Sequence, residues 1–443
     1  MYGLILTYLF TAAAAIGALR FPLFGLYVYV GFAVLRPQSI WGWAGDLSRI
    51  SFIVGVAVLV GWAFRGFGSW RLGRAWPIVS ALLIFTTLFV ISASLAGNTE
   101  RSFRSVTELS KLVLPLLVGF TLLQGEEDSR PLWWTIVLAQ GYVAFEMNYN
   151  YLRGRNLAAD GFGGMDNNCF GVSLLVVLGP AVALMLSSTK WYQRCLAGGA
   201  ALLILHTILL TFSRGAMVGL VAVGITAFIM MPKRPKYIAV VVATILLTVR
   251  LVGPQLAERY ATIFVSSEER DGSSQSRLDL WRDCLTVIQE YPIFGVGPAN
   301  WGVVAASYGW SEGKSAHSVW METAAEAGIP AALALLLFFT RAGARLWPIA
   351  RARPTESNRY STTLAIGVVL SVVGFAVAGQ FVSIPALEVP YYVVMLGVAI
   401  LKSTPREAVA TALAGTFAPP PRYQPASARL GPLPAQRTLA TKR

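Results

Sequence analysis

The hydrophobic pattern of the chain consists of long apolar blocks separated by short polar connections. Blocks about as long as a bilayer-crossing helix recur along most of the 443 residues, and such a helix needs about 20 mostly apolar residues. We therefore predict an all-α, polytopic helical membrane protein with twelve or thirteen transmembrane helices. The blocks lie near residues 3–19, 21–35, 50–64, 76–96, 106–123, 132–150, 170–187, 196–212, 214–231, 237–252, 327–348, 361–381 and 385–401.

Composition supports this class, and the charge distribution adds a topology. The chain is 55% hydrophobic and 13% charged, with a net charge of +14. In a soluble protein that charge would suggest nucleic acid, but here the basic residues collect in short connections, so we expect a lipid bilayer and no nucleic acid as partner. By the positive-inside rule, the basic connections face the cytoplasm. These connections are 65–74, 190–194, 232–236, 341–359 and the tail from 402.

The opposite connections then face the periplasm. They are 97–105, 151–169, 253–326 and 382–384. The N-terminus is outside if blocks 3–19 and 21–35 both span the membrane. It is inside, with twelve spans, if the two form one broken element around Arg20 and Pro22. The sequence leaves both paths open.

The connection 253–326 is the one sizeable polar segment, with ten acidic residues against five basic ones. It divides the chain into an N-terminal transmembrane bundle (1–252), a periplasmic helical segment (253–326), C-terminal transmembrane helices (327–401) and a disordered cytoplasmic tail (402–443). Within it we expect a helix that Ser276 caps. Its predicted apolar stripe, at helical spacing, is Leu278, Trp281, Leu285 and Ile288.

Arginines mark the first candidate chemistry. Arg214 interrupts two apolar blocks in "LLTFSRGAMVGL", and an arginine at a membrane edge is costly without a partner, so we expect a functional role. Arg277 and Arg282 lie about 140° apart on the predicted helix, so only one points inward. We favour Arg277, because the first turn of a helix attracts anions; the alternative for Arg282 is an ion pair with Asp279.

His317 is one of two histidines in the chain and lies just upstream of the block 327–348. An imidazole with a pKa near neutrality can act as a general base; a structural role is the alternative. Gly295 and Gly297, in "FGVGPANW", form a turn whose N–H groups could hold an anion, or a plain turn. For His206, in the middle of a block, we expect a hydrogen-bonded packing role.

A second outward connection, "YLRGRNLAADGFGGMDNNCFG", adds substrate-binding candidates. They are Arg153, Arg155, Asp166, Asn167 and Asn168, as a lining for a glycan or a diphosphate. A glycine-rich loop with a helix cap is the alternative. The triplet D-x-D, typical of metal-dependent nucleotide-sugar enzymes, does not occur, so we expect no metal and no other cofactor.

Three motifs in order carry a resemblance to a known family. "SRGAMVGL", "SRLDLWRDCLTVIQEYPIFGVGPANW" and "AHSVWMETAAEAGIP" resemble the core of the bacterial O-antigen ligase and O-antigen polymerase superfamily. The ligase pattern is His, then Asn, Ser or Gln, nine residues, Gly, two residues, and Gly, Thr or Tyr. His317, Ser318 and Gly328 fit it, and Ala331 departs from its last position. The first 130 or so residues, with "FAVLRPQSIWGW", are similar to the O-glycosylation-ligase branch.

The resemblance implies a metal-independent glycosyltransferase of the bacterial inner membrane. Such an enzyme moves a preassembled glycan from undecaprenyl diphosphate to lipid A-core at the periplasmic face, with inversion at the anomeric carbon. Arg214 and Arg277 would hold the diphosphate, and His317 would be the base. Guanidinium groups suit this role because they bind phosphate oxygens bidentately.

Three alternatives remain at this point. Within the superfamily, the chain could be an O-antigen polymerase or a protein O-oligosaccharyltransferase; one compact set of arginines beside one histidine favours a ligase. From another class, a polysaccharide transporter or flippase has similar hydropathy. Transporters place charge at mid-bilayer and often contain internal repeats, whereas the charged motifs here collect at one face.

Overall fold

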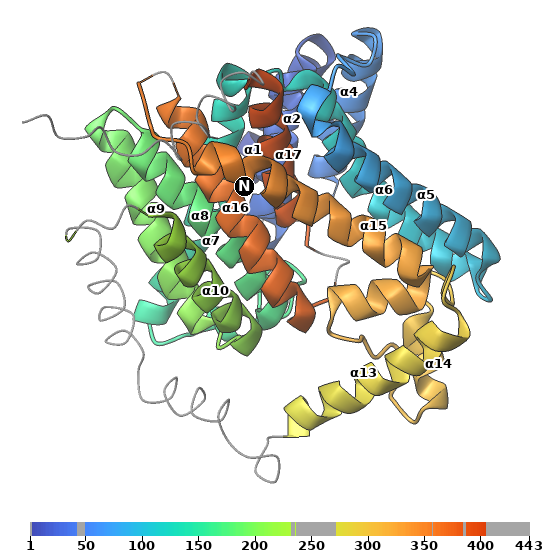
Figure 1. Ribbon diagram of the computed structural model, residues 1–443. Helices are drawn as coiled ribbons and strands as arrows, with labels where there is room; N and C mark the ends of the chain where they lie inside the picture. The colour runs from blue at the N-terminus through green and yellow to red at the C-terminus, as the bar shows by residue number, and fades with distance from the viewer. Residues whose placement is uncertain are drawn as a thin grey trace, which may run out of the picture.

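The computed structural model describes residues 2–41, 49–231, 235, 272–356, 358–383 and 387–404. Within these ranges the chain is helical and contains no strand; an isolated bridge joins Phe162 and Met165. Figure 1 shows the helices packed as a bundle, with α13 and α14 beside the N-terminal part of α15. The helices are α1 (Tyr2–Arg20), α2 (Pro22–Leu35), α3 (Pro37–Ile40), α4 (Ile50–Phe64), η2 (Gly73–Ala75), α5 (Trp76–Leu95), α6 (Thr99–Leu122), α7 (Glu126–Leu152), η3 (Leu157–Ala159), α8 (Asn167–Ser187), α9 (Trp191–Leu210), α10 (Arg214–Met230), α13 (Gly272–Glu290), α14 (Trp301–Ser307), α15 (Val319–Ala350), α16 (Arg359–Ala378), η4 (Gly379–Phe381) and α17 (Val389–Ser403).

The prediction of an all-α polytopic membrane protein is confirmed. Every predicted apolar block falls on a helix except 237–252, which lies outside the described residues. Among the described residues, 7 helices are long and apolar enough to cross a membrane, and the shorter apolar helices α4, α10 and α17 accompany them. The predicted count of twelve or thirteen also included α1, α7 and 237–252. The predicted disordered tail was 402–443; Lys402 and Ser403 instead belong to α17, and 405–443 lie outside the described residues.

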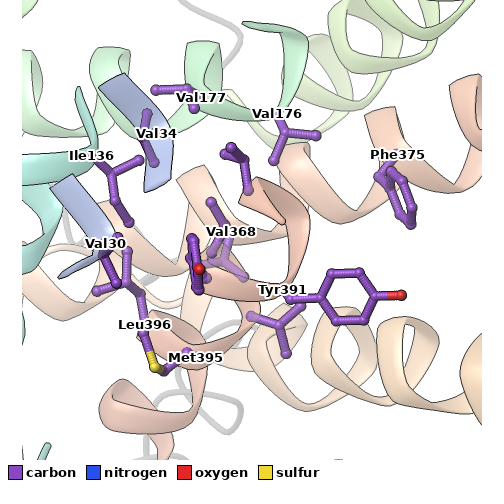
Figure 2. Close-up of a cluster of buried hydrophobic side chains, with 14 of the residues drawn as sticks. Val30, Val34, Ile136, Val176, Val177, Val368, Phe375, Tyr391, Met395 and Leu396 are labelled. Carbon is purple, nitrogen blue, oxygen red and sulfur yellow. The ribbon is translucent and has the colours of Figure 1, made fainter. Parts of the chain in front are cut away.

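Helix α17 forms the centre of the bundle. Its residues from Val389 to Leu401 are all buried, as expected for a helix that is apolar on every side. Figure 2 shows Tyr391, Met395 and Leu396 among side chains of the surrounding helices. Those neighbours are Val30 and Val34 of α2, Ile136 of α7, Val176 and Val177 of α8, and Val368 and Phe375 of α16. The N-terminal and C-terminal blocks therefore share one core.

The outer helices carry apolar side chains on their exposed surface. Ile16 is 70% exposed, Phe52 65% and Val221 61%. Large exposed apolar areas are rare on soluble monomers, and they are the surface that hydrocarbon tails cover in a membrane.

Capping side chains fix where four of the helices begin. Asn98, Asp166, Ser213 and Ser318 each accept a hydrogen bond from a backbone N–H of the first turn, in α6, α8, α10 and α15 respectively. Such caps satisfy N–H groups that have no partner within the helix. Three of the four begin the helices that surround the candidate active site.

Helix α15 is two helical segments joined at Gly328. This glycine has φ 86° and ψ 166°, and a Cβ atom there would lie 2.0 Å from the carbonyl oxygen of Ile293. Only glycine fits both the backbone angle and the close approach. The first segment, 319–327, joins α13 and α14 in a second hydrophobic cluster that includes Leu280, Cys284, Val287, Trp301 and Ala325.

Helix α13 corrects three expectations. It already includes Gly272, so Ser276 is not its cap and Arg277 is not in its first turn. The buried stripe is Leu280, Cys284, Val287 and Ile288, whereas Leu278 and Leu285 are exposed. The spacing in the sequence fits either stripe, and packing on α14 and α15 selects the second.

Candidate active site

His317 lies in a short loop that α15 and α13 hold in place. Its backbone has φ 50°, in the left-handed region, which is strained for any residue with a Cβ atom. Its N–H donates to the hydroxyl oxygen of Ser315 at 3.2 Å. The Trp281 indole of α13 donates to the carbonyl of Ala316 at 2.9 Å. The imidazole therefore projects from a backbone that both neighbours constrain.

Glu322 anchors this loop through one carboxylate oxygen. Oε2 accepts the hydroxyl of Ser315 at 2.9 Å, the N–H of Ala316 at 2.9 Å and the hydroxyl of Ser383 at 2.6 Å. Ser383 follows η4, so one side chain of α15 fastens two separate loops. Three donors converge on one carboxylate oxygen, so the Glu322 side chain defines the position of the loop.

Charged groups from two other elements act on the imidazole of His317. Burial lowers its pKa below the ordinary value, and the Arg277 guanidinium and Lys314 lower it further, while Asp166 opposes them. A histidine with a lowered pKa is neutral at neutral pH and can accept a proton. Arg277 is half-buried, and its charge acts on the imidazole of His317 although it is not at a helix end.

The start of α8 and the start of α10 form the adjoining corner. Asp166 caps α8, and Asn168 accepts a hydrogen bond from Ser213, the cap of α10, at 2.9 Å. Asn167 donates to the carbonyl of Thr211 at 2.9 Å. Arg214 is the first residue of α10 and is half-buried. The predicted helix cap in this loop is confirmed, and the two asparagines hold the corner together.

The short element η4 and the residues after it join this corner to the His317 loop. The Cys169 thiol contacts the carbonyl of Ser383 at 3.7 Å. A Cβ atom on Gly215 would lie 2.6 Å from Cβ of Phe381, so α10 packs directly on η4. The rings of Trp281 and Phe381 are 6.4 Å apart. Arg214, Arg277 and His317 thus lie on three helices or loops that meet around η4.

Several predicted residues have other partners. Arg282 pairs with Asp279 at 3.2 Å and its side chain is 75% exposed, which is the alternative that the spacing allowed. Arg153 stacks on Tyr149 at 4.6 Å, and both Arg153 and Arg155 are exposed. His206 contacts Asn148 and the edge of Tyr151, in the packing role expected of it.

In the turn that contains Gly295 and Gly297, the N–H groups of both glycines donate to backbone carbonyls. Gly295 donates to the carbonyl of Tyr291 at 3.0 Å, and Gly297 donates to that of Glu326 at 2.8 Å. Both glycines have positive φ. Val296 and Gly297 donate to the carbonyls of Ala325 and Glu326, which the kink at Gly328 would otherwise leave without helical partners. The structure therefore agrees with the alternative prediction of a plain turn.

Sequence reasoning missed the acidic and hydroxyl residues behind His317. Glu322, Ser315 and Ser383 carry the network described above, and Glu326 accepts the N–H of Trp301 at 3.2 Å. A signal was present, since "METAAEAG" places two carboxylates at the edge of an apolar block, where they need partners. In the described part of the chain, no group of three or more His, Cys, Asp or Glu side chains is arranged to hold a metal ion.

Comparison with known proteins agrees with these elements. Residues 199–336 match the family model described as O-antigen ligase. That range begins in α9, contains Arg214, Arg277 and His317, and ends in α15 beyond Gly328. No curated protein matches the chain. Residues 199–336 are thus similar to the O-antigen ligase family, and this match supports the O-antigen ligase superfamily.

Proposed function

We propose that the protein transfers a preassembled glycan from undecaprenyl diphosphate to lipid A-core, as an O-antigen ligase. The observation that carries this proposal is that the His317 loop, α13 with Arg277 and α10 with Arg214 meet around η4. The charge of Arg277 also helps to lower the pKa of His317 there. The family match over residues 199–336 supports glycosyl transfer in general; the donor, the acceptor and the residue roles are our inference.

The residues suit a displacement with inversion. The neutral imidazole of His317 takes the proton of an acceptor hydroxyl, whose oxygen forms a bond to the anomeric carbon of the donor. The bond from that carbon to the diphosphate oxygen breaks, and the oxygen keeps the electron pair. Arg277 and Arg214 stabilise the negative charge that develops there. Undecaprenyl diphosphate leaves, and the proton remains on the imidazole until solvent or a diphosphate oxygen takes it.

Reconstitution tests the activity directly. Purified protein in nanodiscs would receive undecaprenyl-diphosphate glycan together with rough lipopolysaccharide, and the product would be resolved by gel. We expect a glycan-extended lipopolysaccharide. Extension of a second lipid-linked glycan instead would identify a polymerase, and transfer to a serine or threonine of an added protein would identify a protein O-oligosaccharyltransferase.

We further propose that the site faces the periplasm across the bacterial inner membrane. Cysteine labelling tests the orientation, in a Cys195→Ser background because Cys195 is exposed. Ser311→Cys, exposed beside the His317 loop, should react with an impermeant reagent from the periplasm. Thr189→Cys, exposed directly before the predicted cytoplasmic connection 190–194, should react only after lysis; the reverse order would overturn the placement.

A further inference from the structure

A groove opens on the outside of the bundle between α2, α4 and α6. Its volume is about 750 Å³, within the range of about 300–1,000 Å³ that is usual for ligand sites. Its walls are apolar and include Phe32, Phe52, Val56, Leu59 and Leu114. Because α2 and α6 lie in candidate membrane spans, the groove adjoins the hydrocarbon of the bilayer.

The walls remain exposed to the surroundings of the bundle. Phe52 is 65% exposed, Val56 43% and Leu114 37%. No other helix among the described residues covers them, so in a membrane the apolar chain of a lipid fills the space. The apolar part of the groove therefore suits acyl chains.

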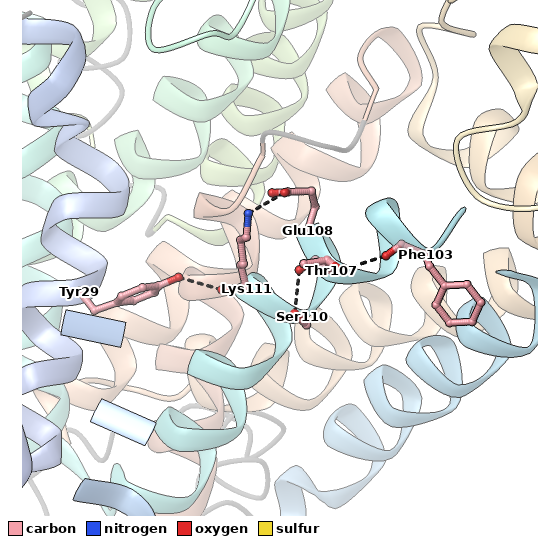
Figure 3. Close-up of polar contacts among 6 residues, drawn as sticks. All are labelled: Tyr29, Phe103, Thr107, Glu108, Ser110 and Lys111. Carbon is pink, nitrogen blue, oxygen red and sulfur yellow. Dashed lines mark hydrogen bonds and ion pairs between the residues drawn. The ribbon is translucent and has the colours of Figure 1, made fainter. Parts of the chain in front are cut away.

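One end of the groove is polar and carries more cations than anions. Arg36, Arg49 and Lys111 line it together with Glu108 and Glu388. Figure 3 shows the Lys111 ammonium against Glu108, at 2.6 Å, and the Tyr29 hydroxyl donating to the Lys111 carbonyl. Three cations against two carboxylates leave one positive charge. A lipid that carries phosphate near its acyl chains complements this end.

A smaller cavity continues from the polar end to the back of the His317 loop. Its volume is about 110 Å³, and it shares Glu108, Lys111 and Glu388 with the groove. Its far side is lined by Glu322 and Glu326 of α15. Glu322 is the residue that fastens the His317 loop, so the groove leads to the side of that loop away from α8, α10 and α13.

The cations proposed for the donor lie elsewhere. No residue of α8, α10 or α13 lines either cavity. Asp166 caps α8, Arg214 belongs to α10 and Arg277 belongs to α13. A transfer between two membrane lipids needs a separate entry for each. The diphosphate-binding arginines occupy one side of the His317 loop, and the groove occupies the other.

We infer that the groove between α2, α4 and α6 binds the lipid part of the acceptor, a phosphorylated and acylated glycolipid, and this rests on the proposed function. The acyl chains lie along Phe52, Val56 and Leu114, and the phosphate lies at Arg49 and Lys111. The saccharide then extends past the N-terminal end of α6 toward the His317 loop. The groove is thus an acceptor site that is distinct from the donor site.

A matched pair of substitutions on α4 tests the inference by kinetics. Val56→Trp fills the groove, whereas Val60→Trp places the same indole one turn further on α4, at a residue that is 38% exposed and does not line the groove. We expect Val56→Trp to raise the acceptor KM about tenfold or more with the donor KM unchanged. Val60→Trp should change neither. A change in donor KM, or no change, in Val56→Trp would overturn the inference.

Charge at the polar end gives a second kinetic test. Arg49→Gln should raise the KM of phosphorylated rough lipopolysaccharide severalfold, since a guanidinium bond to phosphate is lost. The same variant should leave the KM of dephosphorylated acceptor unchanged. An equal effect on both acceptors would mean that Arg49 does not contact the phosphate.

Photocrosslinking separates a failure of the groove from a failure of the proposed function, because it requires no turnover. A photoreactive residue at Val56 would be activated in nanodiscs containing rough lipopolysaccharide, undecaprenyl diphosphate and phosphatidylglycerol. We expect adducts with lipopolysaccharide. Adducts with the polyprenyl lipid, or with phosphatidylglycerol alone, would refute the groove as acceptor site even if transfer occurs. Lipopolysaccharide adducts without transfer would instead refute the proposed function.

Discussion

Removing the Glu322 carboxylate should slow catalysis without weakening the donor. Its Oε2 accepts hydrogen bonds from Ser315, Ala316 and Ser383, and in Glu322→Ala all three donors lose this partner. The loop then keeps the Trp281 hydrogen bond to Ala316 but loses the carboxylate that helps to hold His317 at φ 50°. The arginines proposed to bind the donor belong to α10 and α13, whose residues take no part in these three bonds.

The size of the effect follows from the strain in the loop. A left-handed backbone costs a residue with a Cβ atom roughly 1–2 kcal/mol, and a free loop would relax by that amount. A shift of 1–2 kcal/mol changes a population about 5- to 30-fold. We therefore expect kcat of Glu322→Ala to fall about 5- to 30-fold at unchanged donor KM. Glu322→Gln keeps an acceptor oxygen and should retain most of the activity.

Initial rates at varied donor concentration, in nanodiscs, measure this split between kcat and KM. A double variant shows whether Glu322 acts through the histidine. If it does, Glu322→Ala should cause no further loss in a His317→Ala background, because residues that act as a unit are not additive. Multiplied losses in the double variant, or a raised donor KM in Glu322→Ala, would refute the positioning role.

The remaining predictions concern the base and the fold. His317→Ala should lower turnover by roughly 10²- to 10⁴-fold, and His317→Gln, which cannot take up a proton near neutral pH, should not restore it; substantial activity in the glutamine variant excludes the base. Burial and Arg277 lower the pKa of His317, so kcat/KM should begin to fall only below a pH of about 6.5. In Arg277→Gln this fall on the acidic side of the pH profile should begin at a higher pH. Gly328→Ala places Cβ 2.0 Å from Ile293 O and should lower the melting temperature in detergent, whereas Gly343→Ala, with 3.4 Å to its nearest neighbour, should not.

The helices could be predicted from the sequence because hydrophobicity alone determines them. The block 50–64 coincides with α4, and 76–96 exceeds α5 by one residue. The first residue of a helix was predicted less well where a polar helical turn precedes the apolar residues. Helix α15 begins at Val319, eight residues before the predicted block at 327, because Ser318 caps a segment whose carboxylates lower its hydropathy.

The candidate site was predicted in part, according to how locally each residue is determined. His317 and Arg214 stand at helix starts, which capping residues mark in the sequence. The sequence does not contain the long-range contacts that choose among faces of α13, so Arg277 was selected for a helix end it does not occupy. Ser383 contacts Cys169 of α8, which is 214 residues away in the sequence, and so connects α8 to the His317 loop. No local pattern in the sequence predicts such a contact.

The cations around His317 serve two steps that would otherwise conflict. A leaving diphosphate needs positive charge, and a general base must be neutral before it takes a proton; Arg277 favours both, since it lowers the pKa of His317. Once a donor diphosphate binds beside Arg277, its negative charge offsets the guanidinium and raises the pKa of the imidazole. The base then gains proton affinity when the acceptor hydroxyl is in place. Because kcat/KM reports the free enzyme and kcat the substrate complex, we expect the acidic limb of kcat at a higher pH than that of kcat/KM. Coincident limbs would mean that the diphosphate does not bind next to the His317 and Arg277 pair, and the donor would then have to be placed on another face of α13.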